Sequence, residues 1–451
     1  MGQENSLTAG NVTGALVRFS VPLFLSNLLQ SVYGIVDMAV VGHFVGSAGL
    51  AATGGAAMLG LLILSVSTGI ATGGAVLIAR YEGAGDAERR DAAAGALFSL
   101  SFLAAALVTA LGLAAYPAVF RWMEVPPQAM PYAVGYMKVT LWGAVFVFGY
   151  NAVCAALRGL GDSRRPLFYV GVASALNVVL DVALVGAMGL GTSGAAAATV
   201  AAQGISFLLA AGRLLGGKTP VRLTAQSFRL RKEICVGLLA VGIPTAAQQA
   251  VLNLSYLFVT GMLNSYGVTV AAAAGIGLKV NTFAAMPCWA VGQAITVMTG
   301  QNLGAGDLER ARRTARSGAA VSAAASILTM LLVQALAGQI VGLFDPNPET
   351  IREGVRYLRI CCSLNCVVYA VMYSIDSFAT GAGDAVFSMA NSFLHSVGMR
   401  LALSILLETG MGLGFVGIYW GECLSPVPSF LAGLWYYNSG RWKRKAPGGA
   451  N

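Results

Sequence analysis

Charged residues are scarce in this chain of 451 residues: aspartate, glutamate, lysine and arginine make up 10% of it, and hydrophobic residues make up 57%. Soluble domains carry about 25% charged residues, so this composition does not fit a soluble domain. Apolar runs of about 20 residues, the length that crosses a bilayer, recur along nearly the whole chain. The sequence therefore predicts an all-α polytopic membrane protein that is embedded in the lipid bilayer.

Histidine is nearly absent, with two residues, and the seven cysteines show no metal-ligand spacing with them. This pattern argues against a structural zinc site. The chain also lacks a GxxxxGK[ST] phosphate-binding loop and an HExxH metalloprotease motif, and neither His43 nor His395 has an obvious nucleophile partner. We therefore expect a protein that is not an enzyme and that has no cofactor.

The net charge of +9 could attract nucleic acid. The basic residues lie in short loops between the apolar runs, however, where they set membrane topology, so we expect no nucleic-acid partner. Lysine and arginine gather after the even-numbered apolar segments, as at Arg89, Arg164 and Arg310, whereas the other loops are mostly bare apart from Arg121 and the mixed-charge region 345–359. This bias predicts a multi-pass protein of the inner (plasma) membrane with both termini in the cytoplasm.

Twelve apolar segments are expected as transmembrane helices. Their approximate ranges are 15–41, 50–79, 92–115, 130–157, 166–188, 192–214, 234–263, 270–300, 314–341, 354–380, 385–407 and 414–437. An extended polar break around Lys218, Arg222, Arg229, Arg231 and Lys232 divides them into halves. We expect an N-terminal cytoplasmic tail (1–14), a six-helix bundle (15–215), a basic linker (216–233), a second six-helix bundle (234–438) and a basic tail (439–451).

The two halves repeat one another. Three landmarks recur at nearly the same offset: the turn 83–86 returns at 304–307, the turn 159–162 returns at 381–384, and Pro22 returns as Pro244. Each repeat holds six segments, so both enter the membrane in the same orientation, and a pseudo-twofold axis is expected along the membrane normal. In the glycine–aspartate turns, we expect glycine in the left-handed conformation that ends one helix and aspartate as the cap of the next.

Polar residues interrupt the fifth apolar segment. Asn177 and Asp181 lie four residues apart, so on a helix they share one face. An ionised group at membrane depth costs roughly 2.5–3.5 kcal/mol on insertion scales, and such residues are read as functional by default. The alternative is that Asp181 is protonated, or caps a break in the helix and does nothing more.

The doubled six-segment layout, the paired GxGD turns, Asp37 in VYGIVDMAVVG and the NxxxD of the fifth segment resemble the multidrug and toxic compound extrusion (MATE) family. The resemblance covers about residues 15–437 and implies two six-helix bundles around a central cavity. It also implies antiport, in which inward movement of Na+ or H+ drives export of small amphipathic, often cationic compounds. For the branch with its ion site in the first bundle, it implies ion coupling at Asp37, Asn177, Asp181 and Thr199.

Helix geometry is consistent with that ion site. At about 1.5 Å per residue, Asp181 and Thr199 lie at similar depth on the fifth and sixth segments, and Asp37 lies near the outer end of the first. Oxygen ligands suit a hard cation, and carboxylates can instead carry protons, so the choice between Na+ and H+ stays open.

A polar stripe of Asn27, Gln30 and Tyr33 leads along the first segment to Asp37 and is the expected lining of a substrate cavity. Further candidates are Asn151, Gln248, Asn253, Tyr256 and Met286, for each of which the alternative is an interhelical hydrogen bond or ordinary packing.

Other polar residues fall in the second half. Asp376 is read either as a gating or substrate contact, or as an ion-pair partner of Lys279 or Arg400. His395 is interpreted as a hydrogen-bonded packing residue. Pro22 and Pro244 are expected as hinges, because proline frees backbone carbonyls and permits bending.

Three other functions compete with the antiporter. A lipid-linked oligosaccharide flippase of the same broad superfamily would have a larger basic cavity, and the cavity-side segments carry few arginines. A channel would need repeated filter loops between segments, and none is visible in the sequence. An intramembrane enzyme has no motif to support it. We therefore expect a monomeric, cation-coupled antiporter for small organic cations.

Overall fold

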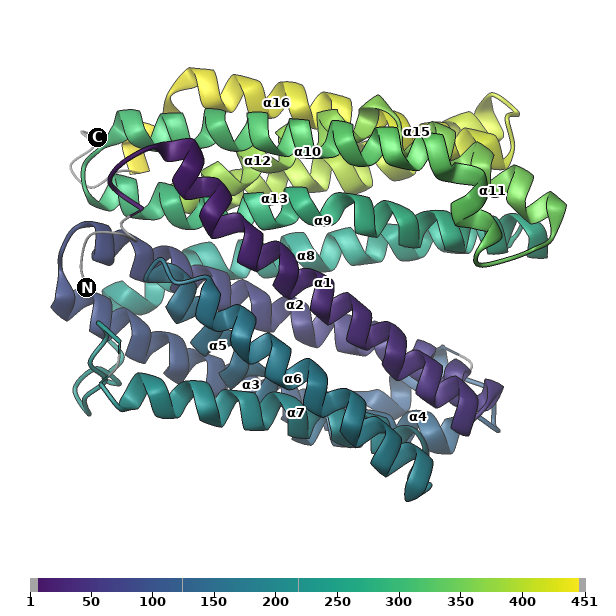
Figure 1. The fold of residues 1–451 in the computed structure, drawn as a ribbon, viewed down its shortest axis with the longest axis horizontal. Coiled ribbons are helices and arrows are strands. Elements are labelled where there is room, and N and C mark those ends of the chain that lie inside the picture. Colours follow the sequence, from purple (N-terminus) through teal and green to yellow (C-terminus); the bar gives the residue numbers. More distant parts are fainter. Residues whose placement is uncertain (1–6, 124, 218, 446–451) are drawn as a thin grey trace. The chain divides into compact units, whose positions relative to one another are not determined.

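The computed structural model describes residues 7–123, 125–217 and 219–445, and this part of the chain is helical throughout its regular structure (Figure 1). Lys218 of the predicted linker, and residues 1–6 and 446–451 of the predicted tails, lie outside the described residues. Within the described ranges, nine helices are long and apolar enough to cross a membrane, and two bent helix pairs bring the number of candidate spans to eleven.

The helices of the first repeat follow the predicted segments closely. Their bounds are α1 (Val12–Phe44), α2 (Ser47–Gly83), α3 (Ala87–Trp122), α4 (Met130–Trp142), α5 (Ala144–Gly159), α6 (Arg164–Asp181), the π-helix η1 (Val182–Ala187) and α7 (Gly191–Leu215). The predicted segment 130–157 is a broken span, because α4 and α5 meet at an angle of 49°.

The second repeat begins with α8 (Lys232–Asn264), α9 (Val268–Gly304) and α10 (Leu308–Gly342). A bent pair follows, α11 (Pro348–Cys361) and α12 (Leu364–Gly381), with an angle of 47°. The rest of the chain comprises α13 (Ala385–Phe393), η2 (Leu394–Leu401), α14 (Ala402–Ile405), η3 (Leu406–Gly410), α15 (Phe415–Leu424), α16 (Pro426–Ser439) and η4 (Arg441–Lys445). The predicted twelfth segment thus falls on two short helices, α15 and α16.

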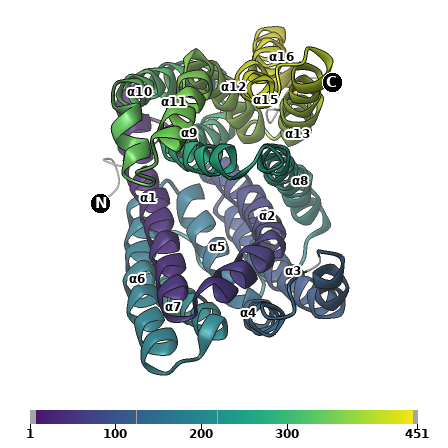
Figure 2. The ribbon, with the colours of Figure 1, turned by 90° about the vertical axis from the view of Figure 1, so that its right-hand side faces the viewer.

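The chain forms two compact units whose boundaries lie inside helices. The C-unit comprises Met1–Phe24 and Ala247–Asn451, and the N-unit comprises Leu25–Ala246. α1 therefore begins in the C-unit and ends in the N-unit, whereas α8 does the reverse (Figure 2). These units differ from the bundles expected from the sequence by the first turns of α1 and α8, and the basic linker belongs to the N-unit.

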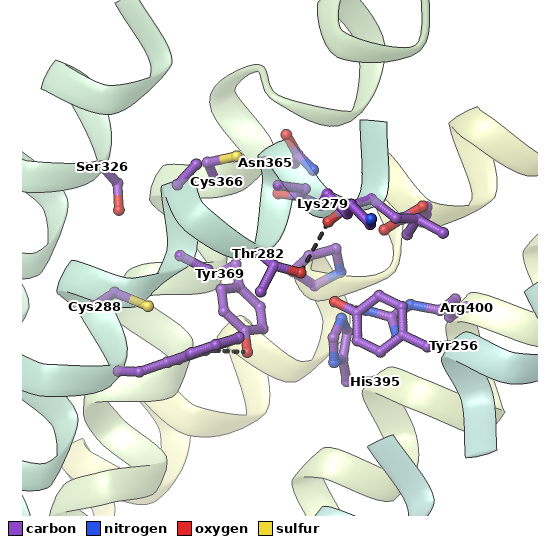
Figure 3. A pocket seen from close by; sticks show the side chains of 17 residues that line it. Tyr256, Lys279, Thr282, Cys288, Ser326, Asn365, Cys366, Tyr369, His395 and Arg400 are labelled. Carbon is purple, nitrogen blue, oxygen red and sulfur yellow. Dashed lines mark hydrogen bonds between the residues drawn. The ribbon is translucent and has the colours of Figure 1, made fainter. Parts of the chain in front are cut away.

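In the C-unit, the segment before α1 is held by the start of α10. The Arg310 guanidinium donates to the backbone carbonyls of Leu7, Ala9 and Gly10 at 2.6–3.4 Å. At the second residue of α1, the Thr13 hydroxyl donates to the Ser317 hydroxyl at 3.1 Å. Elsewhere in this unit, helices α8, α9, α12, η2 and α15 contribute side chains to a polar cavity (Figure 3).

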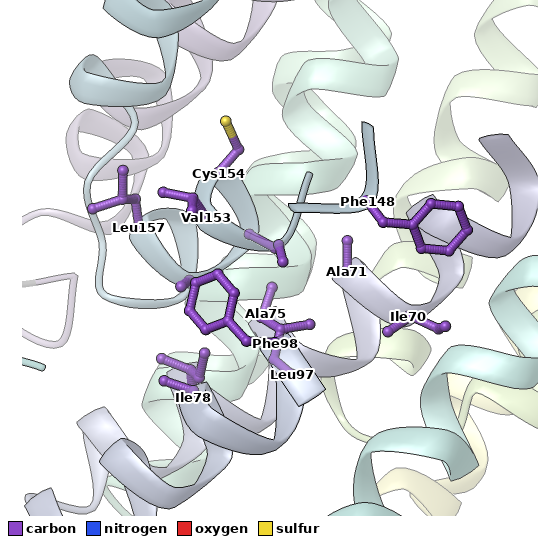
Figure 4. Packing of buried hydrophobic residues seen from close by; sticks show 14 of the residues in the cluster. Ile70, Ala71, Ala75, Ile78, Leu97, Phe98, Phe148, Val153, Cys154 and Leu157 are labelled. Atoms are coloured by element: carbon purple, nitrogen blue, oxygen red, sulfur yellow. The ribbon is translucent and has the colours of Figure 1, made fainter. Parts of the chain in front are cut away.

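The core of the N-unit is built from small residues that let helices approach closely. Ala71 and Ala75 of α2 pack with Leu97 and Phe98 of α3 and with the buried Cys154 of α5 (Figure 4). The linker covers part of this unit, and a Cβ atom on Gly95 would collide with the carbonyl of Ser227 in the linker.

Polar contacts fix the linker against α3 as well. Arg90 donates to the Pro220 carbonyl at 2.7 Å, and Arg231 pairs with Glu88 at 2.8 Å.

The expected glycine–aspartate turns are confirmed at both repeats of the first motif. Gly85 and Gly306 adopt φ of 70° and 77°, and Asp86 and Asp307 accept hydrogen bonds from the third backbone N–H of the following helix at 2.9 and 2.8 Å. The second motif caps α6 through Asp162, which accepts from two backbone N–H groups.

The fourth aspartate, Asp384, does not cap its helix. Its carboxylate accepts a hydrogen bond from the Tyr436 hydroxyl at 3.1 Å instead. The predicted cap is wrong there, because a tyrosine on a distant helix takes the carboxylate.

Candidate functional site

A buried polar pair joins α6 and α7 inside the N-unit. Asn177 of α6 is 2% exposed, and its Nδ2 donates to the Thr199 hydroxyl of α7 at 3.2 Å. The other amide atom, Asn177 Oδ1, is buried and has no hydrogen-bond partner among the described residues. A buried carbonyl oxygen without a donor costs free energy, so this oxygen is suited to accept a proton donor or to coordinate a cation.

Asp181 lies one helical turn beyond Asn177 and ends α6. Its side chain is fully buried, and neither carboxylate oxygen finds a hydrogen-bond partner in the described part of the chain. The helix continues as the π-helix η1, Val182–Ala187. π-Helical turns are rare and occur frequently at functional sites, because they offset the side chains that follow.

Asp37 of α1 provides the second carboxylate. Its Oδ1 is buried and has no hydrogen-bond partner among the residues that the structure describes. It lies near enough to Asp181 for the two charges to interact. The structure therefore brings Asp37, Asn177, Asp181 and Thr199 to one region of the N-unit, and their role in ion coupling stays a prediction. Three of these four residues have oxygen atoms that accept no hydrogen bond from the described residues, and such oxygens can bind a small cation or a proton.

A cavity of about 120 Å³ adjoins this region within the N-unit. Five predicted residues line it: Gln30, Tyr33, Asn151, Asn177 and Thr199. Asn27, Asp37 and Asp181 are not among its lining residues. The ion-site pair Asn177–Thr199 thus forms part of the cavity wall, whereas the two carboxylates do not.

Two polar lining residues of this cavity were not predicted. Gln203 lies four residues after Thr199 on α7, so helical periodicity places it on the same face and could have identified it. Tyr150 precedes Asn151 on α5 and carried no comparable signal. Asn151 itself donates to the Ser67 hydroxyl and to the Val147 carbonyl at 3.1 and 3.0 Å, so it also ties α5 to α2.

The polar candidates of the second half separate into two groups. Gln248 and Met286 are buried and Asn253 is half-buried, and none of the three lines the cavity of the C-unit. Tyr256, Lys279, His395 and Arg400 do line that cavity, which has a volume of about 250 Å³ (Figure 3).

Asp376 is buried on α12, and its Oδ1 accepts a hydrogen bond from Asn391 Nδ2 of α13 at 2.8 Å. Within the described chain, it makes no ion pair with Lys279 or Arg400. The predicted ion pair is therefore wrong, because the partner of Asp376 is the amide of Asn391 and not a basic side chain. The gating role of Asp376 stays a prediction.

His395 packs as expected, with its ring centroid 5.7 Å from that of Tyr369. Neither ring nitrogen has a hydrogen-bond partner among the described residues, so the expected hydrogen bond is not found. Pro22 and Pro244 are buried inside α1 and α8, which continue through both of them, and hinge bending at these prolines stays a prediction.

A model of a known protein family matches the chain twice. The MatE model covers residues 22–183 and again 244–406. The two matches begin at Pro22 and Pro244, the same two prolines that mark the internal repeat.

The protein belongs to the MatE family. The resemblance inferred from the turns and the intramembrane polar residues is thereby confirmed, together with the all-α polytopic membrane fold.

Relatives match nearly the whole length of this MatE protein. It is 28% identical over 434 residues to the probable multidrug resistance protein YoeA of Bacillus subtilis (strain 168), with 95% of this chain and 93% of that protein covered. It is 25% identical over 442 residues to the probable multidrug resistance protein NorM of Thermotoga maritima, with 96% and 93% covered.

Solved structures share the fold of this MatE protein. An outward-facing conformation of a multidrug resistance MATE family transporter of the MOP superfamily superposes with a TM-score of 0.93 at 23% identity, covering 99% of both chains. A MOP superfamily transporter from Pyrococcus furiosus superposes with a TM-score of 0.91 at 24% identity, covering 97% of this chain and 99% of that one.

Proposed function

We propose that this MatE protein is a multidrug efflux transporter that exports small amphipathic, often cationic compounds in exchange for Na+ or H+. The names of the relatives support the substrate class, because the Bacillus and Thermotoga proteins are both described as probable multidrug resistance proteins. The polar region of the N-unit supports the coupling.

The observation that carries the proposal is Asp181, a fully buried carboxylate whose two oxygens have no hydrogen-bond partner among the described residues. An isolated buried carboxylate is costly, and either a proton or a cation removes that cost. Asp37 shares the region, and Asn177 Oδ1 and the Thr199 hydroxyl add neutral oxygens. We assign the coupling cation to these four residues.

The cavity explains how ion and substrate could be linked. Asn177 and Thr199 line the same cavity as Gln30 and Tyr33 of α1, so a bound compound and the coupling cation share one wall. A ligand shifts a conformational equilibrium only by its different affinities for the two states. In this proposal, the cation favours the conformation in which these oxygens converge, and the substrate favours the other.

The test is transport by purified protein in liposomes. A Na+ gradient and a pH gradient are imposed separately, with ethidium and tetraphenylphosphonium as probe cations. The expected result is probe movement against its gradient with one of the two ions, and no such movement in liposomes that contain the Asp181→Asn variant. Equal probe movement with and without both gradients would refute the coupling.

The orientation is proposed from charge. Arg89, Arg164 and Arg310 follow even-numbered segments, and loops rich in basic residues stay on the cytoplasmic side of the membrane. Both termini are therefore placed in the cytoplasm of a plasma-membrane protein. Fusion of a reporter that is active only in the cytoplasm tests each terminus. An inactive reporter on a correctly inserted protein would reverse the topology.

A further inference from the structure

The cavity of the C-unit has charged, polar and aromatic side chains in its lining to which the proposed function assigns no role. Its side chains come from α8, α9, α10, α12, η2, α15 and α16 and include Tyr256, Lys279, Tyr369, Arg400 and Glu422 (Figure 3). The cavity measures about 250 Å³. It is thus slightly smaller than the pockets of about 300–1,000 Å³ that bind drug-sized molecules, and it suits a compound of one or two rings.

Arg400 is the central observation. Its side chain is 3% exposed, its guanidinium carbon lies 4.2 Å from the centre of the Tyr256 ring, and Nη2 donates to the Tyr256 hydroxyl at 3.4 Å. Nε and Nη1 have no hydrogen-bond partner among the described residues. A buried guanidinium that pairs with no carboxylate is costly, since its charge has lost hydration and gained only one aromatic face and one hydrogen bond.

The acid in the same cavity, Glu422, lies near enough to interact with the charge of Arg400 but forms no direct contact with it among the described residues. Glu422 is 4% exposed, and its Oε2 accepts a hydrogen bond from the Tyr357 hydroxyl at 3.0 Å. No ion pair joins Glu422 to Arg400 in the described chain. Lys279 adds a second positive charge, so the lining carries two cations and one anion. Because Lys279 is also exposed, the cavity is open at that residue.

The remaining lining provides donors and flat apolar surface. His395 is 1% exposed, and neither ring nitrogen has a hydrogen-bond partner in the described part of the chain. His395 and Arg400 both lie in the π-helix η2, whose i→i+5 bonding brings residues five apart to one face. Trp289 and Tyr369, joined by a hydrogen bond of 3.3 Å, offer aromatic faces.

We propose that this cavity is a binding site for small aromatic carboxylates. The carboxylate accepts hydrogen bonds from the free N–H groups of Arg400 and is attracted by Lys279, and the ring packs against Trp289 and Tyr369. The site extends the ligands of the protein beyond the cations of the proposed efflux function. It does not depend on the coupling residues of the N-unit.

The first test compares three probes that share a naphthalene ring and carry an anionic, a neutral or a cationic group: 2-naphthoate, 2-naphthamide and 2-naphthamidine. Binding to the purified full-length protein is measured by isothermal titration calorimetry in detergent at low ionic strength. Naphthoate is expected to bind about tenfold or more tightly than the amide, since hydrogen bonds between charged groups are stronger than neutral ones. Equal affinities for all three probes, or tighter binding of the amidine, would overturn the proposal.

Variants then locate the site. Arg400→Gln is expected to weaken naphthoate binding about tenfold or more, and Arg359→Gln, a change at an exposed arginine of α11 in the same unit, should leave it unchanged. Glu422→Gln should tighten binding, because it removes the one negative charge of the lining while the amide oxygen can still accept from Tyr357.

If Arg400→Gln does not elute as a folded monodisperse protein, Lys279→Gln takes its place, since that side chain is exposed. A several-fold loss of naphthoate affinity is then expected at low salt. Wild-type affinity in the folded variants would overturn the proposal. The assay uses no ion gradient, so its failure leaves the antiport proposal standing, and failure of antiport leaves this site standing.

Discussion

Asn177 Nδ2 donates to the Thr199 hydroxyl across 3.2 Å, and this side-chain hydrogen bond ties α6 to α7 one helical turn before the buried carboxylate of Asp181. The bond uses the donor end of the amide and leaves Asn177 Oδ1 without a donor among the described residues. The two helices are thus held in a geometry that presents oxygen atoms to one region.

The first prediction concerns the Thr199 hydroxyl. Thr199→Val keeps the shape of the side chain but removes the oxygen, so the cation loses one ligand and Asn177 loses its acceptor. We expect the concentration of the coupling ion at half-maximal transport to rise about tenfold, since a lost hydrogen bond in a buried site costs about 1–2 kcal/mol. Proteoliposome transport at varied ion concentration measures it. Thr199→Ser, which keeps the hydroxyl, is the control, and equal behaviour of the two variants would exclude a role for this oxygen.

The second prediction separates function from stability at Asp181. Asp181→Asn replaces a buried carboxylate by an amide of the same shape. Coupled efflux is expected to be lost, while thermal unfolding in detergent occurs at the same or a higher temperature, because an unpartnered buried charge destabilises the fold. Asp37→Asn should behave in the same way. Loss of both activity and folded protein would instead mean that the carboxylates serve the fold.

Much of the fold followed from the sequence because its signals are local. The apolar segments, the glycine of each turn and the caps at Asp86 and Asp307 depend on a few neighbouring residues, and the structure confirms them. The failures involve partners that are far apart in sequence. Tyr436 donates a hydrogen bond to the carboxylate of Asp384, and Asn391 donates one to the carboxylate of Asp376. No periodicity in the sequence predicts either contact.

In the candidate site, too, the sequence predicted local features and missed those that depend on the packing of distant segments. Spacing placed Asn177 and Asp181 on one face, and the resemblance to the MATE family added Thr199. The sequence did not reveal that α1 and α8 change units midway, because that exchange depends on the packing of whole helices. Glu422 was overlooked although it is an acid inside the last apolar segment, and the reasoning that selected Asp181 would have found it.

The third prediction uses two helical glycines of the N-unit. A Cβ atom at Gly95 would collide with the Ser227 carbonyl of the linker, whereas one at Gly171 would meet no atom within 4 Å. Gly95→Ala is expected to lower the free energy of unfolding by about 1–3 kcal/mol through overpacking. Gly171→Ala should raise it by up to about 1 kcal/mol, because alanine is the better helix former. Thermal unfolding of both variants measures the difference, and equal stabilities would show that the linker does not pack on α3.

The fourth prediction concerns Arg310, which holds the carbonyls of Leu7, Ala9 and Gly10. Arg310→Gln is expected to destabilise the C-unit by about 1 kcal/mol and to speed hydrogen exchange in the segment before α1. Arg313→Gln is the matched control, since that exposed side chain pairs only with Glu309 on its own helix among the described residues. Unchanged exchange in the Arg310 variant would show that the segment is held by other contacts.

The fifth prediction is a dependence of stability on alkaline pH. Tyr266 lies between α8 and α9 and donates to Glu408 at 2.8 Å, and this hydrogen bond to a carboxylate raises the pKa of Tyr266 above its usual value. The native state thus keeps the proton to higher pH than the unfolded state does. The stabilisation is complete below about pH 10 and is lost as pH rises through the raised pKa.

Thermal unfolding at pH 8 and pH 10.5 tests this effect. Tyr266→Phe is expected to unfold at a lower temperature than wild type at pH 8. The difference between the two unfolding temperatures should shrink as the pH rises toward the raised pKa of Tyr266. A difference that stays constant over the whole range would mean that the phenol acts by packing alone.

The grip of Arg310 on the residues before α1 has a consequence for how the protein is made. The first turns of α1 contact Arg310 and Ser317, which follow them by about 300 residues and are therefore translated much later. Until then, those turns lack their native neighbours. The C-unit is therefore complete only after a docking step that joins a segment made early to a helix made late.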